Sequence, residues 1–267
     1  MTAADELDIE YVDARRVLLD ALEAIGPQIG AVTLIGAQAV YLRTIDRLTE
    51  YQPYTTDAAL VLDPSQLTDL PTLGDAMSNA GFVLTDEPGI WEARFDRAGA
   101  DEEIAVPVDL IVPESIAPSA GRRSARLPGG HGKNTARKSP GVEGALVDRS
   151  PIAIAALDPA DKREIVVDVA GEAALLVAKL HKLGDRLDRP DRLQPKDAGD
   201  VYRLFDVIGP ADMAEGVRRL LADDRSSETA AKAIEYGGRL FDSARSVGVE
   251  LARAALRGPL PEDTVAS

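Results

Sequence analysis

Short apolar runs, each closed by glycine, proline or a polar residue, recur through the first two thirds of the chain. Such runs between turn signals predict buried strands. The predicted strands are 31–35, 58–62, 82–85, 90–95, 104–112, 145–147, 152–156 and 165–169. Apolar residues spaced three or four apart predict helices at 5–25, at 37–47 and in the segment ending near residue 79, which Gly81 would cap.

The pattern changes after Gly171, where only helical periodicity is found. The predicted helices are 173–187, 198–207, 211–222 and 226–256. Strands followed by a run of helices indicate an α+β fold rather than an alternating α/β one. We therefore expect a mixed-sheet α/β domain at 1–168 and a helical domain, a C-terminal bundle, at 169–267.

Composition narrows the chemistry that the chain can perform. It has no cysteine and two histidines, His131 and His181. This excludes a thiolate zinc site, a cysteine nucleophile and a histidine-rich metal centre. Any metal would be held by carboxylates, which favours Mg²⁺ or Mn²⁺. The first ten residues do not resemble a signal peptide, and no apolar run approaches the roughly 20 residues that cross a bilayer. We expect a cytoplasmic protein without a membrane partner.

One basic loop stands out in a chain whose formal net charge is −15. That charge argues against a general nucleic-acid coat protein. The loop at 115–141 is rich in glycine and has no acidic residue. Its cations are Arg122, Arg123, Arg126, Lys133, Arg137 and Lys138. They suggest a mobile arm that binds a polyanion such as RNA; the alternative is a solvated loop without a function.

Two features of the first half suggest a phosphate site. Gly36 joins a predicted strand to a predicted helix, and the backbone N–H groups at a helix start favour anions. Thr55 and Asp57 open the next strand, and Asp109 interrupts a later apolar one. A carboxylate in an apolar strand is costly unless it faces a ligand. Two such aspartates on adjacent strands could converge on divalent cations. The alternatives are an ordinary turn at Gly36, an Asp57 that caps its strand and an Asp109 that faces solvent.

The helical half contributes a second charged set. Lys179, Lys182 and Arg186 are spaced three and four apart, so they share one face of a predicted helix. A charged cluster opens the next helix at Lys196, Asp197 and Asp200. These cations could meet nucleotide phosphates. The alternative is a solvated helix face.

Together, these residues resemble the motif of the nucleotidyltransferase superfamily, which has a DNA-polymerase-β-like fold. In that motif an apolar strand, a glycine and a helix precede an aspartate-x-aspartate strand, and a third aspartate follows. The nearest resemblance is to the AbiEii-like and MenT-like toxins of type IV toxin–antitoxin pairs. It covers roughly residues 30–205 and rests on 36–43 (GAQAVYLR), 54–57 (YTTD), 175–182 (LLVAKLHK) and 196–200 (KDAGD).

The resemblance implies that a nucleoside monophosphate is transferred from an NTP to an acceptor hydroxyl, which in MenT-like members is the 3′ end of tRNA. Carried over, Gly36 and Ala37 would lie at the triphosphate, Asp57 would bind metal, and Asp109 would bind metal and help to deprotonate the acceptor. Lys179 would contact a phosphate, and Asp197 or Asp200 would lie on the nucleotide side of the cleft. Lys182 and Thr55 would also bind the nucleotide. Mg²⁺ or Mn²⁺, a nucleotide, RNA and a cognate antitoxin would be the partners.

Two positions depart from the motif. Ala37 stands where glycine or serine is usual, and its backbone N–H remains available. Ala59 stands where the second aspartate is expected, on the same strand face as Asp57 and roughly 6.5 Å from it. Losing that ligand should slow transfer by orders of magnitude. The chain is then either a degenerate nucleotide-binding module or a toxin silenced by replacement of this aspartate. A third alternative is a transferase that modifies a protein or a small molecule.

Overall fold

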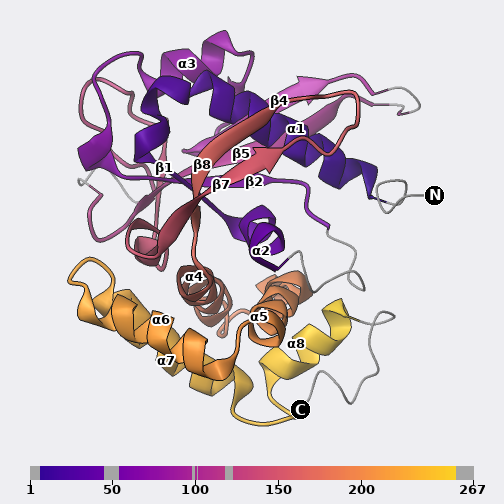
Figure 1. The fold of residues 1–267 in the computed structure, drawn as a ribbon, viewed down its shortest axis with the longest axis vertical. Helices are drawn as coiled ribbons and strands as arrows, with labels where there is room; N and C mark the ends of the chain where they lie inside the picture. The colour runs from indigo at the N-terminus through magenta and orange to yellow at the C-terminus, as the bar shows by residue number, and fades with distance from the viewer. Residues whose placement is uncertain (1–6, 45–53, 98–99, 101, 118–122, 257–267) are drawn as a thin grey trace. The chain divides into compact units, whose positions relative to one another are not determined.

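A mixed β-sheet organises the first part of the chain (Figure 1). The computed structural model describes residues 7–44, 54–97, 100, 102–117 and 123–256. Within these residues the strands are β1 (Val32–Ile35), β2 (Ala58–Leu62), β3 (Val83–Leu84), β4 (Ile90–Phe95), β5 (Ile104–Pro113), β6 (Arg137–Ser139), β7 (Arg149–Ala155) and β8 (Glu164–Ala170). Seven of them were predicted to within a few residues.

The strand order is β3-β4-β5-β2-β1-β8-β7, and β6 also pairs with β5. β1 runs parallel to β8, and β5 runs parallel to both β2 and β6. The pairs β1–β2, β3–β4 and β4–β5 are antiparallel. The sheet is therefore mixed, and its central strands β1, β2 and β5 are neighbours.

The central strands have one fully apolar face. Leu34, Leu60 and Leu110 share that face by register and are completely buried. Ala59 and Asp109 lie on the opposite face and are half-buried, whereas Val61 and Ile111 on that face are buried. Side chains alternate between the two sides of a strand, so this second face is partly accessible at residues 59 and 109. The helix α1 (Ile9–Ala24) packs against β2 and β5 and also contacts α3 (Leu73–Asn79).

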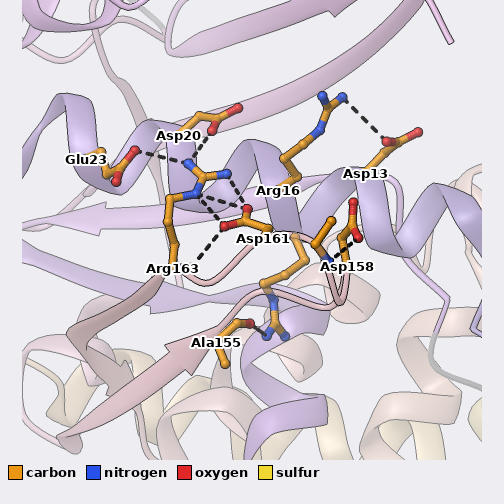
Figure 2. Close-up of polar contacts among 10 residues, drawn as sticks. Asp13, Arg16, Asp20, Glu23, Ala155, Asp158, Asp161 and Arg163 are labelled. Carbon is orange, nitrogen blue, oxygen red and sulfur yellow. Dashed lines mark hydrogen bonds and ion pairs between the residues drawn. The ribbon is translucent and has the colours of Figure 1, made fainter. Parts of the chain in front are cut away.

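A charged clamp joins the connection between β7 and β8 to α1 (Figure 2). The guanidinium of Arg163 lies 2.5 Å from Asp20, 3.0 Å from Glu23 and 2.7 Å from Asp161. The hydrogen bonds that Arg163 donates to Asp161 and the other carboxylates outweigh desolvation and raise the pKa of Arg163. Arg15 also donates a hydrogen bond to the Ala155 carbonyl at 3.0 Å. These contacts fix the edge of the sheet and involve none of the predicted site residues.

The helices after β8 form the second part of the described chain. They are α4 (Glu172–Gly184), α5 (Pro195–Val207), α6 (Pro210–Ala222), α7 (Ser227–Phe241) and α8 (Val247–Ala255). α4 contacts α5, α6 and α7, and α8 packs on α5. Gly184 allows close packing, because a Cβ at that position would lie 2.1 Å from the Tyr236 ring. No helix in the described ranges combines the length and the apolar character needed to span a membrane.

Three sequence predictions of secondary structure were wrong. The run 145–147 lies in a 3-10 helix, Glu143–Leu146, because so short an apolar run does not distinguish strand from helix. The predicted helix 226–256 is two helices, interrupted where the Ser246 hydroxyl accepts a hydrogen bond from the Ser243 backbone N–H. The loop 115–141 contains the strand β6, which was not predicted because its residues are basic and polar rather than apolar.

The residues divide into two compact units. The first comprises the described residues of 1–38, 53–139 and 150–169, and the second those of 39–52, 140–149 and 170–267. The helix α2 (Gly36–Thr44) begins in the first unit and continues in the second. The domain boundary at 168/169 stays a prediction, while contacts place 140–149 with the helices. The predicted α+β class with C-terminal helices is confirmed.

Candidate functional site

A turn at Gly36 joins β1 to α2. Its φ is +82°, a conformation that L residues adopt only at a cost, which explains the glycine. A Cβ added to Gly36 would lie 3.5 Å from the Ala59 side chain. The register agrees, because Ile35 pairs with Ala59. The turn and position 59 are therefore neighbours, and Ala37 follows in the first turn of α2.

Asp57 is held in place immediately before β2. The buried Thr55 hydroxyl donates a 2.6 Å hydrogen bond to its carboxylate. Gln38 donates from its amide to the Asp57 carbonyl at 3.1 Å, and Arg15 donates to Gln38 at 2.9 Å. The family resemblance implied that Thr55 binds the nucleotide; in this structure its hydroxyl is bonded to Asp57. Gln38, which fixes this segment, carried no sequence signal beyond its place after Gly36.

Asp109 lies beside Ala59, since the two residues are direct partners of the parallel pair β2–β5. Paired residues of neighbouring strands point to the same side, about 4.8 Å apart. Side-chain alternation continued one residue back from β2 gives Asp57 the same face. We call Gly36, Asp57, Ala59 and Asp109 the sheet-face site.

Arg137 forms an ion pair with the carboxylate of Asp109. Its guanidinium Nε donates to both carboxylate oxygens at 2.8 and 3.0 Å, and its Nη2 makes a further short contact. β6 positions this arginine by pairing Arg137 with Ile111 of β5. The contact of Arg137 with RNA stays a prediction; in this structure its guanidinium is paired with Asp109.

The rest of the basic loop was expected to be a mobile arm, and its described part is instead attached to the sheet. The Trp91 indole donates to the Thr135 carbonyl at 3.0 Å, and Ser124 bridges to Arg137. His131 accepts a 3.0 Å hydrogen bond from the Leu73 backbone N–H and is buried. The other cations predicted to contact RNA differ in their surroundings. Arg126 and Lys133 are exposed, and Lys138 is half-buried on β6. Arg123 lies 3.8 Å from Glu87, and Arg122 lies outside the described residues.

As folded, the sheet-face site does not fit a two-metal centre. Within the described ranges, no three carboxylate or imidazole groups gather in an arrangement that could hold a metal ion. Position 59 offers a methyl group, and Arg137 already neutralises Asp109. The two expected metal ligands, Asp57 and Asp109, therefore remain without the third donor that the motif requires.

The second predicted charged set forms a buried cluster. The Lys179 ammonium lies 2.9 Å from Asp197 and 2.6 Å from Asp200. Lys182 lies 3.1 Å from Asp197. Side-chain exposure is 7% for Lys179, 0% for Asp197 and 3% for Asp200, so these charges compensate one another away from water. We call Lys179, Lys182, Asp197 and Asp200 the helix ion cluster.

The protonation of this cluster follows from burial and mutual attraction. Burial alone would raise the pKa of Asp197, but Lys179 and Lys182 outweigh it and lower that pKa to about 2. Burial would lower the pKa of Lys179, but Asp200 and Asp197 outweigh it and raise that pKa. Asp197 and Lys179 therefore both stay charged at neutral pH. The contact of Lys179 with phosphate stays a prediction; in this structure its ammonium is enclosed by two carboxylates.

The cluster also extends to α2. The Arg203 guanidinium lies 3.5 Å from Asp200 and 4.9 Å from the Tyr41 ring centroid. Burial and the charge of Asp200 raise the pKa of Tyr41 to about 12, so the phenol stays protonated. The cluster thus joins α4 and α5 to the described residues of α2 in the second unit. Its chemistry is that of a structural ion network.

Comparisons with known proteins add little to this geometry. No family model matches the chain, and no curated protein does. Two structures from Helicobacter pylori resemble it over most of their length: JHP933, with a TM-score of 0.33, 11% identity and coverage of 94% of this chain and 93% of that one; and a protein described as a candidate nucleotidyltransferase, with a TM-score of 0.29, 13% identity and coverage of 93% and 96%. These TM-scores are too low to transfer a function.

Proposed function

We propose that this chain is a nucleotidyltransferase-type protein whose transfer reaction is suppressed by Ala59. The proposed reaction moves a nucleoside monophosphate from an NTP to an RNA hydroxyl, with the 3′ end of tRNA as the acceptor. The acceptor oxygen would attack the α-phosphorus, pyrophosphate would leave, and the hydroxyl proton would pass to a base. A cytoplasmic location, a toxin role with a cognate antitoxin, and dependence on Mg²⁺ or Mn²⁺ in the reactivated enzyme belong to the same proposal.

The observation that carries the proposal is the register of three adjacent strands. Ile35 of β1, Ala59 of β2 and Asp109 of β5 are direct partners, and Gly36 follows Ile35. An aspartate at position 59 would lie between the glycine turn and Asp109, and two residues from Asp57. Replacing this one side chain would therefore give the face three neighbouring carboxylates beside a helix start. Such an arrangement is suited to phosphoryl-type transfer.

A second candidate function is a nucleotide-binding module without turnover. The pair between Asp109 and Arg137 favours it, because the guanidinium supplies the positive charge that the carboxylate would otherwise seek. In this case the Gly36 turn would hold phosphates and no acceptor would be modified. The two candidates differ in what a restored aspartate does.

The test is a transfer assay with the wild type, Ala59→Asp and Ala105→Asp. Ala105 is a matched control, because it is exposed on β5 and lies four residues, about 13 Å, from Asp109. Each protein is incubated with labelled NTPs, Mg²⁺ and total RNA, and the labelled RNA is resolved by size. We expect Ala59→Asp to label RNA at least about a hundredfold faster than the wild type or Ala105→Asp, since a lost metal ligand costs at least that much.

The outcomes separate the alternatives. Label in a protein or a small molecule instead of RNA would replace the proposed acceptor. Label in none of the products, with nucleotide binding retained, would leave the binding module as the function. Equal labelling by Ala59→Asp and Ala105→Asp would remove the sheet-face site from the account altogether.

A further inference from the structure

An open cavity of about 560 Å³ lies in the second unit, between the end of α4 and the start of α5. Five of the residues that line it are cations: Lys182, Arg186, Arg189, Arg192 and Lys196. Its two carboxylates are Asp185 and Asp191. The lining therefore carries an excess of three positive charges, in a chain whose net charge is −15.

The backbone explains why the three arginines gather. Arg189 N–H donates to the Arg186 carbonyl at 2.8 Å, and Arg192 N–H donates to the Arg189 carbonyl at 2.9 Å. These bonds close two consecutive turns, which bring the three arginines to the lining of one cavity. Pro190–Arg192 is itself a 3-10 helix. The backbone therefore places the three arginine side chains at the same cavity.

The charges in this cavity are only partly compensated. Lys182 and Arg186 lie 3.1 and 3.9 Å from the buried carboxylate Asp197, so counting that group leaves an excess of two. Across the described part of the chain, Arg189, Arg192 and Lys196 form no ion pair, and all three are exposed. Clustered like charges repel one another, and an anion would relieve that repulsion.

Asp185 and Asp191 do not cancel this excess. Asp185 already accepts a 2.8 Å hydrogen bond from the Tyr236 hydroxyl. Asp191 follows Pro190 at the exposed rim. Neither carboxylate lies within ion-pair distance of the pocket arginines in the described residues. Arginine forks match phosphate oxygens in pairs, and the cavity volume is that of a small-ligand site.

We propose that this arginine pocket is a binding site for a phosphate-bearing ligand, either a nucleotide polyphosphate or an RNA backbone. The pocket shares no residue with the sheet-face site, and the proposal stands whether or not Ala59→Asp transfers nucleotides. Three of its residues, Lys182, Arg186 and Lys196, were expected from the sequence to meet nucleotide phosphates. Arg189 and Arg192 are the ligands that the structure adds.

The test compares Arg189→Gln/Arg192→Gln with a charge-matched control, Arg218→Gln/Arg245→Gln. Arg218 and Arg245 are exposed in the same unit and do not line the pocket. Three probes are used on the full chain: tripolyphosphate and ATP by calorimetry, and a labelled single-stranded RNA by fluorescence anisotropy. Each lost charged hydrogen bond should weaken binding about tenfold or more, so the pocket variant should bind about a hundredfold more weakly. The control should stay within about twofold, because surface charges outside a site contribute little.

The probes also identify the source of the phosphate. Binding of tripolyphosphate and ATP, sensitive to the pocket variant, supports a nucleotide; the same sensitivity for RNA alone supports a backbone. If no probe binds the wild type, or if both variants weaken binding equally, the proposal is overturned. Unchanged thermal melting of both variants confirms that the fold is intact, which is expected because all four arginines are exposed.

Discussion

The sheet-face site and the helix ion cluster carry similar residues but treat them in opposite ways. In the cluster, Lys179, Asp197 and Asp200 neutralise one another in nearly complete burial. On the sheet, Asp57 and Asp109 keep intermediate exposure, and the position between them is a small alanine. In the cluster the charges stabilise the fold, whereas on the sheet they lie where a ligand could reach them. A charged motif is therefore evidence of a site only when the fold leaves its charges accessible.

The largest expected effect tests whether the cluster is structural. Lys179→Met would leave Asp197 and Asp200 without their main counter-charge, which for a broken buried pair costs about 3–5 kcal/mol of unfolding free energy. Urea unfolding measures this, with Lys196→Met as a control because Lys196 is exposed on α5. The control should change stability by less than about 0.5 kcal/mol. Equal stability of Lys179→Met and the wild type would show that the cluster is not needed for the fold.

The second prediction concerns acid. Asp197 has a folded pKa of about 2 against an ordinary value of 3.8, so its contribution is present above pH 4 and lost as the pH falls through 2. The contribution is about 2 kcal/mol. Lys179 has a raised pKa, so its contribution is complete below 10.5 and lost only in strong alkali. The unfolding free energy of Asp197→Asn should fall less between pH 4 and 2 than that of the wild type.

Asp188→Asn is the control for the acid measurement, because Asp188 is exposed. Its pH dependence should follow the wild type. A wild-type curve as flat as that of Asp197→Asn would mean that the buried pair makes no contribution through protonation.

The third prediction returns to the sheet. Gly36→Ala forces an L residue into φ +82°, which costs about 1–2 kcal/mol, although the space beside Ala59 is sufficient. Gly30→Ala is the matched control, since its φ is not positive and no atom lies within 4 Å of the added Cβ. Thermal or urea unfolding of both variants gives the difference. If ATP binds at the turn, Gly36→Ala should also weaken it, and Gly30→Ala should not.

Much of the fold was readable from the sequence, because apolar runs and turn residues are local signals. β2 and β4 match their predicted limits, and the run of helices after Gly171 is correct. What could not be read was set by partners distant in the chain. The strand β6 inside a basic loop depends on pairing with β5, and the pair of Arg137 with Asp109 spans 28 residues.

The candidate site divides along the same line. The sequence predicted that Asp57 and Asp109 lie on adjacent strands; the structure places Asp109 on β5 and Asp57 immediately before β2, which pairs with β5. Spacing could not reveal that Lys179 would be enclosed by Asp197 and Asp200, since a solvated helix face and a buried network have the same periodicity. The arginine pocket did have a signal, arginines three residues apart at 186, 189 and 192, but its meaning depended on the 3-10 path.

The smallest effect is expected for Arg137→Gln. Arg137 and Asp109 are partly exposed, so losing the pair should cost about 1 kcal/mol or less after solvent screening. Arg94→Gln, on the neighbouring strand β4, also breaks an ion pair and serves as the control. Urea unfolding compares the two. A loss of several kcal/mol for Arg137→Gln would make this arginine part of the structural core.

The most direct test of the account is Mn²⁺ binding to four proteins: the wild type, Ala59→Asp, Arg137→Gln and the double variant. Electron paramagnetic resonance of free Mn²⁺ gives the affinity without requiring activity. The account holds that residues 57, 59 and 109 share one face and that Arg137 takes the place of a metal ion beside Asp109. The double variant should then bind Mn²⁺ at least about tenfold more tightly than the wild type, with each single variant between them. Double-variant affinity no higher than that of the wild type would mean that these carboxylates do not converge.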